Sequence, residues 1–242
     1  MNNLYVTENI KCDYDISPLF RKPFPHVIKR EFIEPKLYRR LKNSFPQLPK
    51  NGGRTGYSLY RHHPEYNFFI NSHKDWQLLC NSLMRFEFIE YVTRQFRDYF
   101  EKSGCIINPE RARYIDFVET AEMVANRDIE CKLAPEDLFV RIDIQQAKQG
   151  YSKKVHCDFM RRFATCLIYF SDADEIEMNG GELGLHTSNR NLYSKIQPRD
   201  NLAIIFPRWP NSFHSALPII STEKPRNFLY IAISSTVALW PA

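Results

Sequence analysis

The hydrophobic pattern divides the chain into two parts of different character. From residue 138 onward, short apolar or alternating runs recur, and turn-rich pieces separate them. Runs of this length and spacing are typical of β-strands in all-β folds. They predict a core of short strands at about 138–235, a double-stranded β-helix of the jelly-roll or cupin kind. The expected strands are Leu138–Ala147, Phe163–Phe170, Glu182–His186, Leu202–Phe206 and Arg226–Ser234.

The N-terminal part instead shows helical spacing. Val27–Phe32 reads as a strand, and Pro35–Phe45 follows as a helix with proline at its start. A second helix is expected over Trp76–Met84 with Asp75 as its cap, and a third over Glu87–Lys102. The aromatic residues of the third helix recur at helical spacing, so we expect them to pack against the sheet. The fold class is therefore mainly β with flanking helices (α+β).

A chain of 242 residues can bury one substantial core. We expect an N-terminal arm at 1–22 and a single domain at 23–242. The segment Arg113–Leu133 has no clear pattern, and it is the best candidate for a lid near a functional site.

Composition excludes several classes of partner. The 33 basic and 28 acidic residues give a net charge of +5, and they are scattered, so nucleic acid is not an expected partner. No apolar run approaches the length of a membrane span, so no membrane partner is expected. The six cysteines show no Cys-x-x-Cys spacing, which predicts reduced thiols and a cytoplasmic location. The oligomeric state is left open.

The strongest chemical signal is His156-Cys157-Asp158, followed at a distance by His214 and Arg226. In an extended strand, residues i and i+2 point to the same face, so His156 and Asp158 can reach one metal. Two histidines and one carboxylate form the ligand set that holds non-haem Fe(II) with open positions. Arg226 lies in an apolar strand, where a guanidinium can pair with a carboxylate.

The order of these motifs resembles the iron(II)/2-oxoglutarate-dependent dioxygenases, on the branch that contains the prolyl hydroxylases. The likeness spans roughly residues 23–235 and is dense from Gly150 to Ser234. Apart from the metal motif, it rests on the following segments: Arg162-Phe163-Ala164-Thr165, Leu167-Ile168-Tyr169-Phe170, Gly180-Gly181-Glu182-Leu183, Gln197-Pro198-Arg199-Asp200 and Leu202–Pro207.

This resemblance implies a hydroxylase that uses Fe(II), 2-oxoglutarate and O2, with ascorbate as a candidate reductant. His156, Asp158 and His214 would be the catalytic metal ligands. Arg226 would anchor the distal carboxylate of 2-oxoglutarate, with the Tyr169 hydroxyl as a second donor. The substrate would be a small molecule, an amino acid or a peptidyl side chain, and succinate and CO2 would be released.

Some positions leave alternatives open. Lys224 is a rival for the role of Arg226, because some relatives use lysine near that distance. The branch often has a tyrosine ten residues before the first metal histidine, where this chain has Gln146, and Phe228 stands where several related families have serine. His186 is a competing metal ligand, although its strand position favours a structural role.

Two further classes of function compete with the hydroxylase. A cupin-type metal isomerase or 2-oxoglutarate-independent oxygenase usually carries more histidine ligands and needs no Arg226. A non-catalytic binding module on the same fold has no reason to keep all three ligands. In the halogenase branch a small residue replaces the carboxylate, so Asp158 favours hydroxylation.

Overall fold

The computed structural model describes residues 12–48, 55–120, 122–123 and 133–240. The helices in these ranges are α1 (Pro35–Asn43), α2 (Pro64–Ser72), α3 (Lys74–Leu83), α4 (Phe86–Lys102) and the 3-10 helix η1 (Pro109–Arg111). The strands are β1 (Val27–Lys29), β2 (Gly56–Leu59), β3 (Arg113–Tyr114), β4 (Asp137–Ala147), β5 (Lys153–His156), β6 (Arg162–Tyr169), β7 (Asn179–Gly180), β8 (Leu183–His186), β9 (Leu192–Ile196), β10 (Ala203–Pro207), β11 (His214–Ala216), β12 (Ile219–Ser221) and β13 (Arg226–Ser234).

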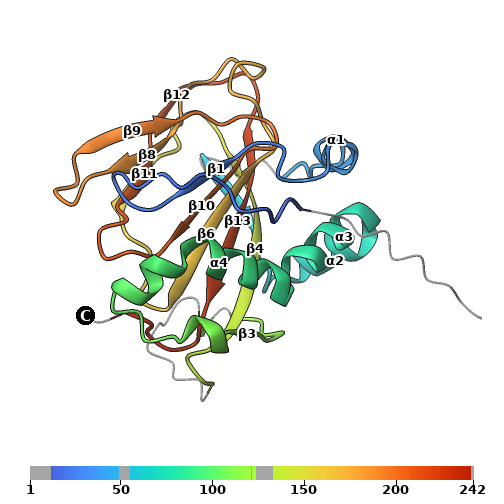
Figure 1. Ribbon diagram of the computed structural model, residues 1–242. Helices are drawn as coiled ribbons and strands as arrows, with labels where there is room; N and C mark the ends of the chain where they lie inside the picture. The colour runs from blue at the N-terminus through green and yellow to red at the C-terminus, as the bar shows by residue number, and fades with distance from the viewer. Residues whose placement is uncertain (1–11, 49–54, 121, 124–132, 241–242) are drawn as a thin grey trace, which may run out of the picture.

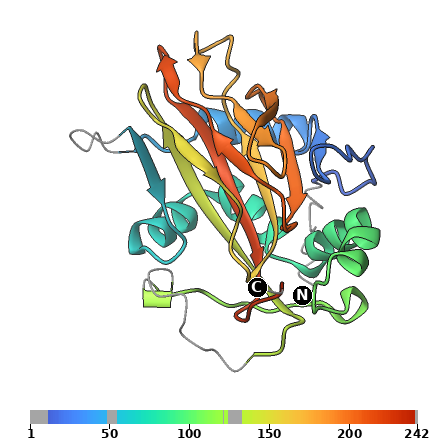
Figure 2. The same cartoon turned by 90° about the vertical axis from the view of Figure 1, so that its left-hand side faces the viewer.

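The strands form a large sheet and a small sheet that face each other, as the double-stranded β-helix requires (Figures 1 and 2). The large sheet runs β1-β10-β6-β13-β4-β2, with β3 paired to β4, and the small sheet runs β5-β11-β8-β9. A two-stranded ribbon, β12-β7, lies beside them. The predicted fold class is confirmed.

Alternation along the large sheet gives the molecule two cores. In β6, Cys166 and Ile168 pack with the helices, whereas Leu167 and Tyr169 pack in the second cluster, with residues of the small sheet such as Leu185. The helices therefore cover one face of the large sheet, and the site must be sought on the other.

The helices predicted near residues 35, 76 and 87 are confirmed, with boundary shifts of one to two residues. The cap assigned to Asp75 is wrong. Helix α3 begins at Lys74, two residues earlier than predicted, its N-cap is His73, and no side chain caps it. The carboxylate of Asp75 instead accepts two hydrogen bonds from Arg40 of α1, at 2.9 and 3.0 Å.

Several elements lie where no strong pattern predicted them. Helix α2 occupies a segment of low amphipathicity. Strand β9 is mostly exposed, and β2 has four residues at the edge of the large sheet. Short edge strands carry few buried residues, so they leave a weak signal in the sequence.

The described part of the predicted N-terminal arm lies against the domain. Cys12 forms a β-bridge with Ile33, and Tyr14 stacks on Tyr91 of α4 with ring centroids 5.4 Å apart. The division of the chain near residue 22 stays a prediction. Residues 1–11 and part of the expected lid, 121 and 124–132, lie outside the described ranges.

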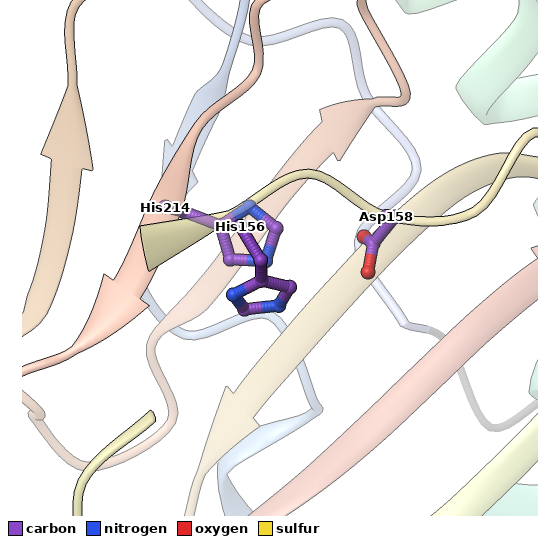
Figure 3. A group of neighbouring side chains, drawn as sticks. All are labelled: His156, Asp158 and His214. Carbon is purple, nitrogen blue, oxygen red and sulfur yellow. The ribbon is translucent and has the colours of Figure 1, made fainter. Parts of the chain in front are cut away.

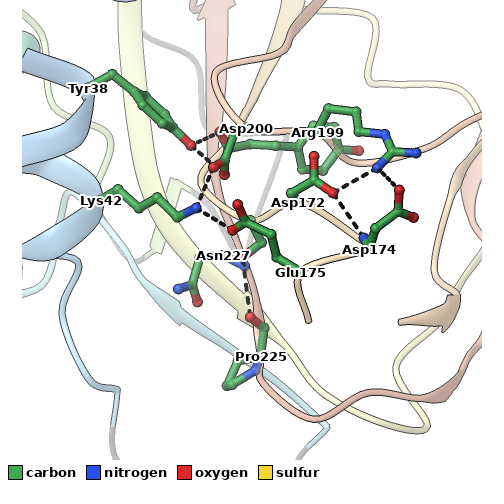
Figure 4. A network of polar contacts seen from close by, with 11 residues as sticks. Tyr38, Lys42, Asp172, Asp174, Glu175, Arg199, Asp200, Pro225 and Asn227 are labelled. Atoms are coloured by element: carbon green, nitrogen blue, oxygen red, sulfur yellow. Dashed lines mark hydrogen bonds and ion pairs between the residues drawn. The ribbon is translucent and has the colours of Figure 1, made fainter. Parts of the chain in front are cut away.

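A polar network fixes α1 to the turns at one end of the sheets (Figure 4). The Tyr38 hydroxyl donates to Asp200 at 2.8 Å, and Lys42 pairs with both Asp200 and Glu175. Arg199, in the same turn as Asp200, pairs with acidic residues of the loop after β6. The network joins α1 to the loop that follows β6 and to the turn that precedes β10.

Two further observations concern the class of protein. The cysteines in the described ranges are all free: Cys12, Cys80, Cys105, Cys157 and Cys166. None of the helices described is both long enough and apolar enough to cross a bilayer.

Candidate metal centre and active site

Two histidines meet where the small sheet faces the large one. His156 ends β5 and pairs directly with His214, which begins β11. Their ring centroids are 4.3 Å apart. The Nδ1 atoms of His156 and His214 lie 2.8 and 2.9 Å from the carbonyl oxygens of Lys154 and Ser212. Donation from Nδ1 to these carbonyls leaves both Nε2 lone pairs available to a metal.

Asp158 completes the group, although not by strand alternation. Strand β5 ends at His156, so Asp158 is presented by the loop that follows it. Its carboxylate accepts a 2.6 Å hydrogen bond from the Thr165 hydroxyl, and the guanidinium of Arg208 donates to its carbonyl at 3.5 Å. The ligand atoms of His156, Asp158 and His214 all lie within 4.8 Å of one another (Figure 3).

The electrostatics of the group suit a divalent cation. Burial, followed by the neighbouring His214, lowers the pKa of His156 to about 4, and burial also lowers the pKa of His214. Burial opposes ionisation of Asp158, but His214 and Arg162 outweigh it and hold its pKa below the usual value. At neutral pH the group therefore offers two neutral imidazoles and one carboxylate, which is the protonation state that a metal requires.

One buried atom supports a metal at this point. His156 Nε2 is buried and has no hydrogen-bond partner in the described part of the chain. Buried polar atoms are nearly always satisfied, so this nitrogen needs a ligand. A metal ion shared with Asp158 and His214 would supply it.

A cavity extends from the histidines between the two sheets, and Arg226 and Tyr169 lie at its far side. Arg226 is 3% exposed, and its guanidinium lies over the rings of Phe228 and Tyr151, at 4.9 and 5.4 Å from their centroids. Its Nη1 donates to the Gly181 carbonyl, while its Nε is buried and unpartnered among the described residues. A buried guanidinium with unused donors is suited to a carboxylate ligand.

Tyr169 lines the same cavity and is 2% exposed. Burial raises the pKa of its hydroxyl, with a smaller opposing effect from Arg226. The hydroxyl is therefore protonated at neutral pH and able to donate a hydrogen bond.

Lys224 and Arg226 differ in environment. Lys224 is exposed, precedes β13, and lines a separate cavity on the helix side of the large sheet. Gln146 also faces that side, where its amide pairs with Leu48 and Asn227. Gln145 lines the site cavity instead, so the position of the family tyrosine corresponds to a residue on the opposite face here.

His186, the competing ligand, and Trp209, which precedes His214, are both held by other contacts. Both ring nitrogens of His186 are occupied, by the Ser215 hydroxyl at 2.8 Å and the Arg190 carbonyl at 3.1 Å. Trp209 packs edge-on against Tyr99 of α4, with centroids 5.8 Å apart. These contacts support structural roles.

Beyond the metal group lies a second cavity of about 480 Å³, which opens to solvent. Its wall includes charged residues that the motif search did not single out, among them Glu119, Arg141 and Lys153. Glu119 belongs to the stretch expected to form a lid, and it pairs with Arg141 at 3.3 Å and Arg161 at 2.9 Å. Isolated charges in a strand or loop resemble solvated surface, so no sequence pattern indicates that they converge.

Comparisons with known proteins concern the part of the chain that carries these residues. Residues 142–231 match the family model described as the 2OG-Fe(II) oxygenase superfamily, and they include all three candidate ligands and Arg226. No match was found among curated protein sequences.

Solved structures share the fold. One is a 2OG-Fe(II) oxygenase family oxidoreductase from Burkholderia pseudomallei, with 12% identity and a TM-score of 0.52, covering 89% of this chain and 86% of that one. Another comes from work on prolyl 4-hydroxylases from Phytophthora capsici, with 14% identity and a TM-score of 0.50. That match covers 89% of this chain but only 60% of the Phytophthora chain.

The motif order, the family match and the His-Asp-His group lead to one class. Residues 142–231, which carry the His-Asp-His group, are similar to the Fe(II)/2-oxoglutarate-dependent oxygenases. The protein is therefore an enzyme that uses Fe(II), 2-oxoglutarate and O2, as its sequence predicts.

Proposed function

We propose that this enzyme hydroxylates an unactivated C–H bond of a small molecule, an amino acid or a peptidyl side chain. The observation that carries the proposal is the grouping of His156, Asp158 and His214, with the unpartnered His156 Nε2, at the end of a cavity that leads to Arg226. When bound there, Fe(II) and 2-oxoglutarate supply the oxidative chemistry, in which O2 is consumed and succinate and CO2 are released.

His156, Asp158 and His214 would hold the metal, and a set of three protein ligands would leave room for 2-oxoglutarate and O2. The carbonyls bound by the two Nδ1 atoms set the tautomers of His156 and His214, and Thr165 orients the carboxylate of Asp158. Asp158 also bears on the outcome of the reaction. Halogenase relatives leave that position free for halide, so the carboxylate favours hydroxylation.

Arg226 is proposed to bind the distal carboxylate of 2-oxoglutarate, with the Tyr169 hydroxyl as a second donor. Removing a carboxylate from water is costly unless a charge and hydrogen bonds replace the lost solvation. The buried guanidinium and the protonated phenol offer both within one cavity. The exposed position of Lys224 on the other side of the large sheet supports Arg226 as the anchor.

The substrate is proposed to enter through the cavity beside Asp158. Its volume of about 480 Å³ lies within the range of roughly 300–1,000 Å³ that small-molecule sites occupy. A peptidyl side chain also fits the proposal, since prolyl 4-hydroxylases share this fold. The cytoplasmic location stays a prediction based on the cysteines.

The test is iron-dependent conversion of 2-oxoglutarate to succinate by the purified enzyme, alone and with a panel of amino acids and peptides. We expect slow basal conversion, and faster conversion with a substrate that gains one oxygen atom by mass spectrometry. Absence of iron- and 2-oxoglutarate-dependent turnover with every compound and without any would reject the proposal.

A further inference from the structure

A bulge in β5 turns a lysine toward the metal group. Along β11, His214 pairs with His156 and Ala216 pairs with Lys153, so three residues of β11 lie opposite four of β5. In a regular strand, Lys153 and His156 would point to opposite faces. The extra residue places both side chains on the wall of the same cavities. Lys153 thus lies between the metal group and the outer cavity.

Most charges of the outer cavity neutralise one another. Arg141 pairs with Asp143 at 2.8 Å and with Glu119 at 3.3 Å, and Glu119 also pairs with Arg161 at 2.9 Å. These two arginines and two carboxylates leave no net charge. Arg141 and Arg161 therefore have acidic partners, whereas Lys154, which also lines the cavity, forms no ion pair with a described residue.

The cations nearest the metal group have no such partner. Lys153 forms no ion pair with any residue that the structure describes. Arg162 donates to the Ser234 hydroxyl, and its Nε is buried without a hydrogen-bond partner in the described ranges. Asp158 is a carboxylate that interacts electrostatically with both cations, and in the loaded enzyme it would bind the metal. The positive charges of Lys153 and Arg162 are therefore not neutralised at the place where the substrate is proposed to bind.

We propose that Lys153 is a specificity residue that binds a carboxylate of the substrate, so that the enzyme acts on small carboxylic acids. This inference rests on the proposed function of the same site. An ammonium group among other cations gains a counter-ion when a carboxylate binds, and such charge-assisted hydrogen bonds are among the strongest in proteins. The cavity volume of about 480 Å³ favours a small acid, because a polyanion such as nucleic acid needs an extended basic surface.

The experiment compares free acids with their carboxamides, which differ in the charge that Lys153 would recognise. The iron-loaded enzyme receives 2-oxoglutarate and the twenty L-amino acids, their N-acetyl derivatives and the carboxamides of both series. Succinate formation above the basal rate is the readout. We expect stimulation by acids only, with the best acid about 10- to 100-fold above its amide in kcat/KM. Equal stimulation by amides, or stimulation by neither series, overturns the inference.

Variants then test the residue. Lys153→Met should remove most of the preference for acid over amide, and Lys153→Glu should reverse it. Lys195→Met is the matched control, because Lys195 lies on β9 of the same sheet, half exposed, and pairs with Glu182. If Lys153→Met raises the KM for 2-oxoglutarate but keeps the acid-to-amide ratio, Lys153 serves the co-substrate and the inference is wrong.

The two proposals fail differently. A wild-type enzyme without any iron-dependent succinate formation contradicts the proposed function itself. A wild-type enzyme with normal basal turnover but no discrimination between acids and amides contradicts only the role of Lys153.

Discussion

His156 and His214 lie directly opposite each other on antiparallel strands, with ring centroids 4.3 Å apart. The pairing of β5 with β11 therefore brings together two ligands that are far apart in sequence. Because backbone carbonyls bind both Nδ1 atoms, the same strand ends also fix the rings. The proximity of the two proposed ligands is thus a consequence of strand register, and a change of register would separate them.

The carboxylate ligand can be tested with a neighbour as control. Asp158→Ala should lower Fe(II) affinity by at least about 100-fold and abolish turnover, since it removes a ligand. Cys157→Ala should keep both near wild type, because the Cys157 thiol contacts the Pro210 carbonyl and lies outside the metal group. Isothermal titration with Mn(II) in place of Fe(II) measures affinity. Wild-type affinity in Asp158→Ala would refute the ligand assignment.

Thr165 should affect metal affinity only through its hydrogen bond to Asp158. Its hydroxyl donates to the carboxylate at 2.6 Å, so Thr165→Val should weaken metal binding about 10- to 100-fold while it preserves side-chain volume. Thr165→Ser keeps the donor and should stay within a few-fold of wild type. If the serine and valine variants bind Mn(II) equally, the hydrogen bond does not position the ligand.

Substitution of Arg226 and substitution of Lys224 should have different effects on the binding of 2-oxoglutarate. Arg226→Ala should raise the KM for 2-oxoglutarate strongly, by about 100-fold or more, because a buried carboxylate loses its charge partner. Lys224→Ala should leave that KM near wild type, since Lys224 lines another cavity. Mn(II) affinity, measured in parallel, should be unchanged in both. The opposite result would assign the anchor to Lys224.

Substitution of His186 should lower the stability of the fold, whereas substitution of His214 should abolish metal binding. His186→Asn should cost about 1–3 kcal/mol of unfolding free energy, because it disturbs hydrogen bonds to Ser215 and Arg190. Its metal affinity should stay within a few-fold of wild type. His214→Asn should lose metal binding. Urea unfolding and metal titration of both variants check this, and a loss of metal binding in His186→Asn would make His186 a ligand.

The sequence predicts the candidate site where chemistry and spacing coincide. Residue type and order select His156, Asp158 and His214, and the structure brings their ligand atoms within 4.8 Å of one another, although their role as metal ligands stays a prediction. The strands of the large sheet were predicted because their buried residues are numerous. Strand alternation does not explain the position of Asp158, because the strand ends at His156 and a loop presents the carboxylate.

Other features depend on contacts that a sequence pattern does not encode. The choice between Arg226 and Lys224 could not be made from alternation, since it requires knowing that β13 begins at Arg226. The approach of Lys153 to the metal group depends on a bulge in β5, which shifts the parity of one strand by one residue. Asp75 satisfied the rule for a helix cap, but a guanidinium of α1 pairs with it.

Oxygen labelling tests the central claim most directly, and it requires no knowledge of the substrate. The iron-loaded enzyme is supplied with 2-oxoglutarate under ¹⁸O₂, and the succinate formed in basal turnover is analysed by mass spectrometry. The account predicts one ¹⁸O atom in each succinate, with Asp158→Ala forming none above background. Succinate without the label, or formation that continues without oxygen, would contradict it.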